Sequence, residues 1–166
     1  GARVFLPSED EWYKAAYYDP DKSGGPGYWN YPTGLDLPIP GADMSEGTDP
    51  GNNANYRDGV APYPIDSPWY TTLVGEFELS DGPYGTFDQG GNVYEWDEAI
   101  IGTKRGIRGG SFLHGAYTLK VSTRYSYVAT GETGFFGFRV ASVVPEPIPE
   151  PSTAVLGIFG FAFLCG

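Results

Sequence analysis

The sequence predicts a loop-rich α+β domain with few short strands and helices, on three observations. Glycine and proline are abundant, at 25 and 15 of 166 residues, and they are scattered without a period, so regular elements should be short. Aromatic residues make up 16% of the chain, which supplies a core and argues against disorder. One stretch near the start carries the signals of a helix. A length of 166 residues fits a single domain.

The helix is expected at residues 9–18. Ser8 and Glu11 have the Ser-x-x-Glu spacing of a capping box, and the acids that follow Ser8 suit the positive end of a helix dipole. The apolar residues of this segment share one face: Trp12, Ala15 and Ala16. This face should pack against the core.

Ordered loop should follow from Asp19 to Pro68, because Pro, Gly, Asn and Asp interrupt the whole stretch. Three later segments are typical of short extended pieces: residues 71–77, 105–112 and 136–144. Glu76 and Glu78 alternate at the first piece, so both should face one side of a strand. Two carboxylates there suit either a glycosidase pair or a solvated strand face.

The charge and cysteine counts exclude several functions. The formal net charge is -11, and nucleic-acid backbones are bound by clustered Lys and Arg, so nucleic acid is excluded as a partner. The acid excess forms either a solvated surface or, in part, cation sites. The single cysteine, Cys165, excludes an intrachain disulfide, a dithiol redox centre and a four-cysteine zinc site.

The chain changes character at Val144. Residues 144–152 alternate proline with acid and should form an extended linker, which bounds a folded domain at residues 1–143. Residues 153–166 are uncharged and almost wholly apolar, but a bilayer span takes about 20 residues. We expect this apolar segment to be cut short. A buried C-terminal strand or helix is the alternative.

Four stretches, taken in order, resemble the formylglycine-generating enzyme family of sulfatase-modifying-factor domains. They are "VFLPSEDEWYKAAYY", "YGTFDQGGNVYEW", "RGIRGGSF" and "GFFGFRVA". The resemblance covers about residues 3–142 and implies a fold similar to C-type lectins. It also implies that the N-terminal part of the family domain is missing here.

The tail resembles a PEP-CTERM sorting signal, in which a Pro-Glu-Pro triplet, here Pro149 to Pro151, precedes a membrane helix. This resemblance implies an exosortase-type processing enzyme as a partner. It also implies export, with the protein anchored through its tail or released at the surface or into the extracellular matrix of a Gram-negative-type bacterium. Extracellular polysaccharide or a protein ligand would then be a further partner.

Calcium is the metal that the family resemblance implies, and the residues suit it. Calcium takes six to eight oxygens from carboxylates, carbonyls and water, and the glycines of "FDQGGNVYEW" allow a tight turn. The implied ligands of a first site are the Asp88 side chain, the Gly91 and Val93 carbonyls and the Glu95 side chain. Asp88 and Asn92 closing turns without metal is the alternative.

A second calcium site is implied by the stretch "ANYRDGVAPYPIDSPW". Its ligands would be the Asn55 side chain, the Tyr56 carbonyl, the Asp66 side chain and the Pro68 carbonyl. Asp66 capping a turn is the alternative.

The oxidase centre of the family is absent from the sequence. Active members of the family bind copper(I) through two cysteines after the Gly-Gly-Ser motif, and thiolates suit that soft ion. His114 and Tyr117 match the family pattern, but Leu113 and Thr118 stand at the two cysteine positions. We therefore expect no copper and no catalytic residues. Ser111 with His114 is a weak candidate for a nucleophile pair, because no acid is placed to orient the histidine.

Four arginines stand out in this acidic chain: Arg105, Arg108, Arg124 and Arg139. Either they pair with acids or carbonyls and fix loops, or they help to form a groove for an anionic or sugar-like ligand. The candidate groove residues are His114, Tyr117 and Arg124, with aromatic walls from Trp29, Trp69 and Tyr125.

The sequence thus predicts a calcium-stabilised binding or structural module that is not an oxidase. A formylglycine-generating oxidase acting on a sulfatase cysteine is the first alternative. A glycan-binding, lectin-like module is the second.

Overall fold

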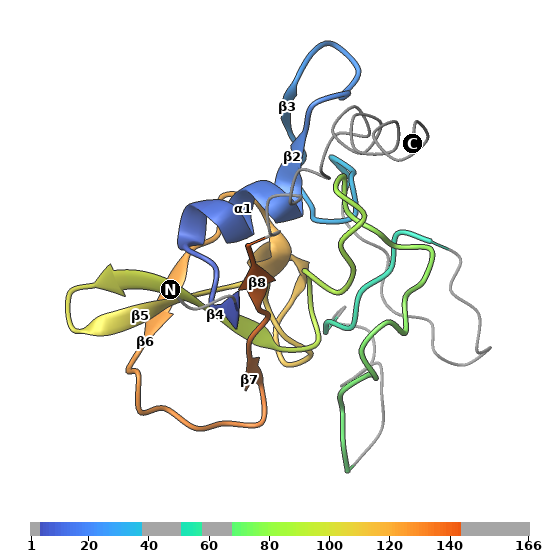
Figure 1. The fold of residues 1–166 in the computed structure, drawn as a ribbon. Helices are drawn as coiled ribbons and strands as arrows, with labels where there is room; N and C mark the ends of the chain where they lie inside the picture. The colour runs from blue at the N-terminus through green and yellow to red at the C-terminus, as the bar shows by residue number, and fades with distance from the viewer. Residues whose placement is uncertain (1–3, 38–50, 58–67, 144–166) are drawn as a thin grey trace, which may run out of the picture.

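A four-stranded sheet and one helix organise the chain in the computed structural model, which describes residues 4–37, 51–57 and 68–143 (Figure 1). Asp66 and both predicted tail segments lie outside these residues. The elements are β1 (Val4–Phe5), α1 (Glu9–Tyr17), β2 (Tyr18–Asp19), β3 (Gly27–Tyr28), β4 (Tyr94–Ile101), β5 (Lys104–Arg108), η1 (Ala116–Leu119), β6 (Tyr125–Tyr127), β7 (Phe136–Gly137) and β8 (Ala141–Ser142).

The main sheet has the order β6-β5-β4-β7. β4 pairs antiparallel with β5 and parallel with β7, while β1 pairs with β8 and joins the two ends of the described chain. The helix α1 packs against β4, and the β2–β3 hairpin projects away from the main sheet (Figure 1). The described residues include no helix long and apolar enough to cross a membrane.

The predicted helix is confirmed and ends at Tyr17. The Ser8 N–H and hydroxyl each donate to Glu11 Oε2 at 2.8 Å, and the Glu11 N–H donates to Ser8 Oγ at 3.3 Å. These bonds form the reciprocal capping box that the sequence predicts. Trp12, at 1% exposure, and Ala16, at 0%, lie on the buried face, as expected.

Replacing Ser8 with alanine should lower the free energy of unfolding by about 1 kcal/mol, because the N-terminal turn loses its side-chain acceptor. Chemical denaturation of the wild type and the variant measures this change. Ser8→Thr is the matched control, since it keeps the hydroxyl and should lose much less. Equal losses in both variants would contradict a capping role.

The predicted loop from Asp19 to Pro68 contributes to the core where it is described. Tyr31, at 2% exposure, and Tyr56, at 4%, pack with Ala54 and Leu119 in one buried cluster. Core packing of its aromatic side chains therefore keeps this loop in place where it has no helix or strand. Tyr28 on β3, in contrast, is half exposed and is not part of this cluster.

The expectation of an extended piece at residues 71–77 was wrong. This segment turns, with Gly75 at φ +84° and the Glu76 N–H donating to the Leu73 carbonyl at 3.3 Å. Glu76 and Glu78 are both exposed and do not share a strand face, which removes the structural basis for a carboxylate pair. The segments at 105–112 and 136–144 do contain strands, namely β5, β7 and β8.

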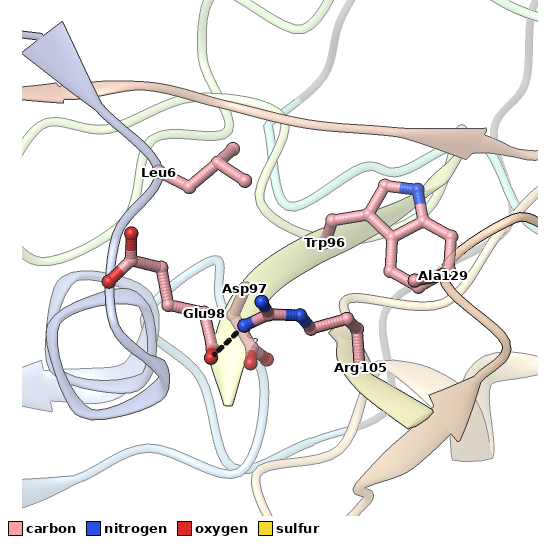
Figure 2. Close-up of a pocket in the computed structure, with 6 residues that line it drawn as sticks. All are labelled: Leu6, Trp96, Asp97, Glu98, Arg105 and Ala129. Atoms are coloured by element: carbon pink, nitrogen blue, oxygen red, sulfur yellow. Dashed lines mark hydrogen bonds between the residues drawn. The ribbon is translucent and has the colours of Figure 1, made fainter. Parts of the chain in front are cut away.

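β4 and β5 form a hairpin with a bulge between Trp96 and Ile100. Asp97 is buried at this bulge, and its Oδ1 accepts the Ala99 N–H at 2.8 Å. Figure 2 shows the Asp97 side chain beside the neighbouring Glu98 and Arg105. Gly106 on β5 leaves room for this carboxylate, because a Cβ there would lie 2.2 Å from Asp97 Oδ1. A glycine in the middle of a strand thus permits a buried acid in the sheet.

Candidate functional site

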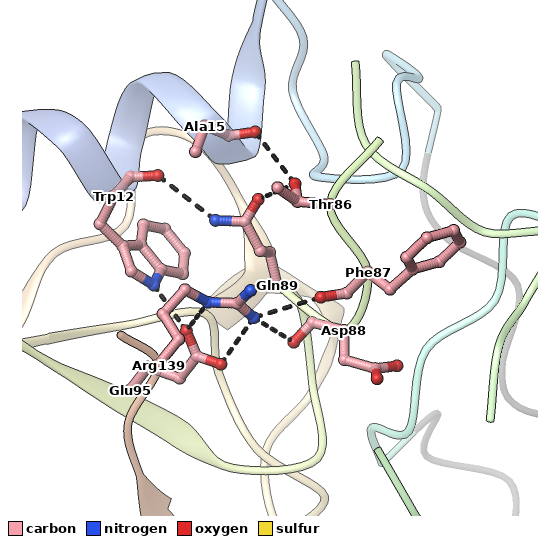
Figure 3. Close-up of polar contacts among 8 residues, drawn as sticks. All are labelled: Trp12, Ala15, Thr86, Phe87, Asp88, Gln89, Glu95 and Arg139. Atoms are coloured by element: carbon pink, nitrogen blue, oxygen red, sulfur yellow. Dashed lines mark hydrogen bonds and ion pairs between the residues drawn. The ribbon is translucent and has the colours of Figure 1, made fainter. Parts of the chain in front are cut away.

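A buried ion pair joins the start of β4 to the segment after β7 (Figure 3). Arg139 Nε donates to Glu95 Oε2 at 2.5 Å, and its Nη2 donates to Oε1 at 2.7 Å. Trp12 Nε1 of α1 donates to the same Oε2 at 2.6 Å. Glu95 is only 7% exposed, so its charge is compensated by a bidentate guanidinium and an indole N–H.

The same arginine fixes the loop that precedes β4. Its Nη2 also donates to the carbonyls of Phe87 at 3.3 Å and Asp88 at 3.0 Å (Figure 3). Gln89 and Thr86 bind each other and reach α1, where Gln89 Nε2 donates to the Trp12 carbonyl at 3.5 Å. The loop of residues 86–89 is therefore held between the helix and Arg139.

The four predicted ligands of the first calcium site meet at one cavity of about 530 Å³: Asp88, Gly91, Val93 and Glu95. Asp88 Oδ2 accepts the Gly75 N–H at 2.6 Å, and Oδ1 has no donor among the hydrogen bonds of the described residues. Each carboxylate oxygen has two lone pairs. Glu95 Oε2 uses both, but Oε1 accepts only from Arg139. Asp88 Oδ1 is therefore open to a cation, whereas both oxygens of Glu95 are engaged by the Arg139 guanidinium.

Gly91 brings the two predicted calcium loops into contact. Its φ is +80°, a conformation that glycine adopts without strain, and a Cβ there would lie 2.5 Å from the Asn55 carbonyl oxygen. The Asn92 N–H donates to that same carbonyl at 2.7 Å. Because Gly91 has no Cβ, the backbones of the two loops can lie this close together.

The second predicted site shows a buried oxygen without a partner. Asn55 is 0% exposed, and its Nδ2 donates to the Tyr70 carbonyl at 3.0 Å and to Asn92 Oδ1 at 3.2 Å. Within the described ranges, Asn55 Oδ1 accepts no hydrogen bond. Such an oxygen fits a ligand of a cation, since buried polar atoms normally have partners. Tyr56 and Pro68 lie on either side of residues that the structure does not describe.

No group of three or more His, Cys, Asp or Glu side chains gathers in the described parts of the chain. The two proposed sites do not require one, because carbonyl and amide oxygens supply half or more of their predicted protein ligands. Calcium binding stays a prediction on these observations.

A second cavity, of about 290 Å³, lies beside His114 and is lined chiefly by apolar and aromatic residues: Tyr94, Ile107, Tyr125, Tyr127, Phe135 and Phe136. Its polar members are His114 and Ser126. The His114 ring packs edge-on against Tyr94 and Phe135, and burial lowers its pKa. We call this the aromatic cavity.

The nucleophile pair considered from the sequence is not accessible. Ser111 Oγ lies 2.8 Å from His114 Nδ1, but Ser111 is 0% exposed. Its hydroxyl therefore orients the histidine ring and does not face a substrate.

The residues at the family cysteine positions are part of the packed structure. Thr118 is 2% exposed in η1, and its hydroxyl donates to the Gly115 carbonyl at 2.8 Å. A Cβ on Gly110 would lie 2.4 Å from Thr118 Oγ1, so the Gly-Gly-Ser turn packs closely on this side chain. Leu113 is half-buried. Neither residue supplies a thiolate.

The groove predicted from the sequence is only partly assembled. Tyr125 lines the aromatic cavity with His114, but Arg124 points to Glu9, with Nε to Oε1 at 2.7 Å. Tyr117 is 57% exposed and is not among the residues that line this cavity. Trp29 hydrogen-bonds Asp19 Oδ2 at 2.9 Å beside the β2–β3 hairpin. Closeness to His114 in the sequence therefore did not predict which residues line this cavity.

The structural interpretation of the arginines is confirmed. Arg108 Nη2 lies 2.7 Å from Glu9 Oε1, and Arg124 binds the same carboxylate. Burial raises the pKa of Glu9, but the hydrogen bonds from the two arginines outweigh it, and the pKa is lowered. Arg105 donates to the Glu98 carbonyl at 2.8 Å.

Asp97 gives a pH prediction, because burial raises its pKa above the usual value of 3.8. The ionised form therefore costs stability at neutral pH, and this cost disappears as the pH falls through the raised pKa. Asp97→Asn should be more stable relative to wild type at pH 7 than at pH 4. Urea denaturation at both values measures the difference, and a pH-independent difference would contradict the assignment.

Comparisons with known proteins agree with this architecture. Residues 2–144 match the sulfatase-modifying factor enzyme 1-like domain. A comparison with curated proteins finds no match. Among solved structures, PvdO from Pseudomonas aeruginosa is 21% identical, with a TM-score of 0.54 over 86% of this chain and 53% of its own.

Two further solved structures are similar. The structure of CarF is 22% identical, with a TM-score of 0.51 over 85% of this chain and 48% of its own. Treponema denticola variable protein 1 is 23% identical, with a TM-score of 0.49 over 84% of this chain and 47% of its own. The chain thus spans about half the length of the structures it matches.

The likeness to PvdO and CarF concerns the fold, and it supports the loop-rich α+β fold of formylglycine-generating enzymes that the sequence predicted. The family match extends over all of the described residues. The chain belongs to the sulfatase-modifying factor enzyme 1-like domain family.

Proposed function

We propose that this chain is a binding module of the sulfatase-modifying-factor fold that takes a sugar-like ring in its aromatic cavity and has no copper oxidase activity. The observation that carries the proposal is the environment of His114. An uncharged aromatic cavity of about 290 Å³ lies beside this histidine, and the nearby family cysteine positions hold Leu113 and Thr118.

The composition of the cavity favours a sugar-like ligand over an anionic one. None of its lining residues is a lysine, an arginine or an acid. Apolar and aromatic walls with a few polar groups are typical of sites for small molecules. The C–H faces of a pyranose ring suit aromatic walls, while Ser126 and His114 can hydrogen-bond hydroxyl groups. Arg124, the cation expected here, is engaged by Glu9.

Binding to a glycan array, followed by calorimetry on any hit, tests this function. Tyr125→Ala should weaken binding about tenfold, because an aromatic contact contributes about 0.5–1.5 kcal/mol beyond its buried area. Trp69→Ala is the matched control, since Trp69 is 77% exposed and lies outside the cavity. An array without binding, or equal losses in both variants, would reject the sugar ligand.

The oxidase alternative has a direct test. The full chain should not convert the cysteine of a sulfatase peptide to formylglycine in the presence of copper(I) and oxygen, because no pair of thiolates is available to hold the metal. Mass spectrometry of the peptide reads the product. Turnover above a metal-only control would restore the oxidase interpretation.

Calcium is part of the proposal as a structural ion. Asp88, Glu95 and the carbonyls of Gly91 and Val93 would hold the first ion, and Asn55, Tyr56, Asp66 and Pro68 the second. Calcium would stabilise the folded state by holding together loops that contain few strands. Asp88 Oδ1 and Asn55 Oδ1, which accept no hydrogen bond in the described ranges, support this assignment.

Export to the cell surface is likewise proposed on the tail resemblance alone. An exosortase-type enzyme would process the protein there, and extracellular polysaccharide would then be the nearest source of a sugar ligand. Expression of the full reading frame with and without an exosortase should change the mass of the exported product. An unchanged mass would contradict this part.

A further inference from the structure

A row of four tyrosine rings lies where α1 meets the projecting β2–β3 hairpin (Figure 1). Tyr18 and Tyr28 are register partners across the hairpin, and their ring centroids lie 5.2 Å apart. The Tyr28 centroid is also 5.1 Å from that of Tyr13 on α1, and the Tyr18 centroid is 6.4 Å from that of Tyr84. We call these four residues the tyrosine row. It shares no residue with the aromatic cavity.

The tyrosine row is open to solvent, and its rings are tilted against one another. Tyr28 is 46% exposed and Tyr84 is 47% exposed, while Tyr13 and Tyr18 are half-buried. The Tyr28 ring is inclined by 58° to Tyr18 and by 40° to Tyr13. Rings tilted in this way form ridges and grooves, not the flat platform on which sugar rings stack. Grooves lined by aromatic residues are a usual docking surface for polyproline II segments.

A lysine adds a positive charge to the row. Lys14 Nζ lies 5.4 Å from the Tyr18 ring centroid, and Lys14 is exposed and takes part in none of the ion pairs of the described residues. Lys22 differs, because its Nζ donates to the Tyr28 carbonyl at 2.7 Å and lies 3.2 Å from Asp36 Oδ2. A ligand of the tyrosine row should therefore carry an acid that can pair with Lys14.

The sequence itself contains a segment of this chemistry. Residues 144–152 lie outside the described ranges and read "VPEPIPEPS", with proline at every second position from 145 to 151. Glu146 and Glu150 stand between these prolines. Proline fixes its backbone near the polyproline II conformation, so such a segment loses little conformational entropy when it docks. Its prolines suit the tilted rings, and its acids suit Lys14.

The segment can also reach the row within one molecule. It follows Val143, and the neighbouring Ser142 of β8 pairs with Val4 of β1. The chain covers at most about 24 Å from Val4 to Tyr13, as five extended residues and four helical ones. Nine residues in the polyproline II conformation extend about 28 Å. This length suffices for the end of the row formed by Tyr13 and Tyr28.

We propose that residues 144–152 dock on the tyrosine row of the same molecule as a polyproline II helix. The prolines pack between the tilted rings of Tyr13, Tyr28 and Tyr18, and a glutamate pairs with Lys14. The docked segment covers exposed aromatic surface and holds the tail against the domain.

Calorimetry with a synthetic peptide of residues 144–152 tests the proposal on two full chains. One is the wild type, and the other carries Pro145→Ser, Pro147→Ser, Pro149→Ser and Pro151→Ser, which frees the row. The serine variant should bind the peptide about tenfold more tightly than the wild type, where the tethered segment competes at a millimolar effective concentration. Equal affinities would mean that prolines from another molecule occupy the row, and they would overturn the assignment.

Further substitutions in the serine variant locate the binding site. Tyr28→Ala should weaken peptide binding about tenfold, because it removes the central ring. Tyr117→Ala is the matched control, since Tyr117 is 57% exposed and is not part of the row. A peptide with serine at the four proline positions keeps both acids and should bind at least about tenfold more weakly. No binding of the proline peptide, equal losses in Tyr28→Ala and Tyr117→Ala, or binding of a polysaccharide in its place would reject the proposal.

Discussion

Replacing Arg139 with alanine should destabilise the folded chain by about 3 kcal/mol. The substitution leaves Glu95 as a carboxylate at 7% exposure with only the Trp12 N–H to compensate it. Breaking a buried pair by removing one partner typically costs about 3–5 kcal/mol, and we take the lower end because the Arg139 side chain is 24% exposed. Loss of the bonds to the Phe87 and Asp88 carbonyls adds to the effect.

Urea denaturation measures this loss of stability, and two further variants show whether it comes from the buried ion pair. Arg105→Ala is the matched control, because it also removes an arginine that binds a carbonyl but leaves no buried carboxylate behind. The double variant Arg139→Ala/Glu95→Gln should recover part of the stability, since the neutral amide removes the uncompensated charge. Equal effects of Arg139→Ala and Arg105→Ala would contradict the buried-pair argument.

Local signals in the sequence predicted the helix well, because its ends are set by neighbours. The capping box joins residues only three positions apart, and the buried face repeats at helical spacing. β4 has no comparable signal. Its centre carries Asp97 and Glu98, and its identity as a strand depends on pairing with β5 and β7. The opposite error arose at residues 71–77, where apolar residues suggested a strand but Gly75 allows a turn.

The candidate sites show the same difference between local signals, which the sequence contains, and long-range contacts, which it does not. The residues predicted for a first calcium site lie within eight positions of sequence, and all four line one cavity, while calcium itself stays a prediction. The partners of Glu95 were not predicted, because Trp12 lies 83 positions away and Arg139 lies 44 positions away. Arg124 was assigned to the wrong neighbourhood, since its partner Glu9 is 115 positions away. Charge pairs between residues far apart in the sequence produce no local sequence pattern from which they could be predicted.

Removing calcium should lower the melting temperature of the chain by about 5–10 °C. Ligand binding to the folded state alone stabilises it by about 2.7 kcal/mol at 100 times Kd, and a calcium module of the extracellular kind reaches that ratio near 10 mM calcium. For a domain of this size, 1 kcal/mol shifts the midpoint by about 2–4 °C. Thermal unfolding in chelator and in 10 mM calcium measures the shift.

The general acidity of the chain requires a control, because any divalent cation screens a net charge of -11. Magnesium at the same concentration supplies that screening, but magnesium demands a tight octahedron and gives up its water reluctantly, so it should produce little of the shift. Glu95→Ala should weaken the first site and Asn55→Ala the second, each removing part of the calcium effect. Superposed curves in chelator and calcium, or an equal shift with magnesium, would mean that hydrogen bonds alone hold these loops.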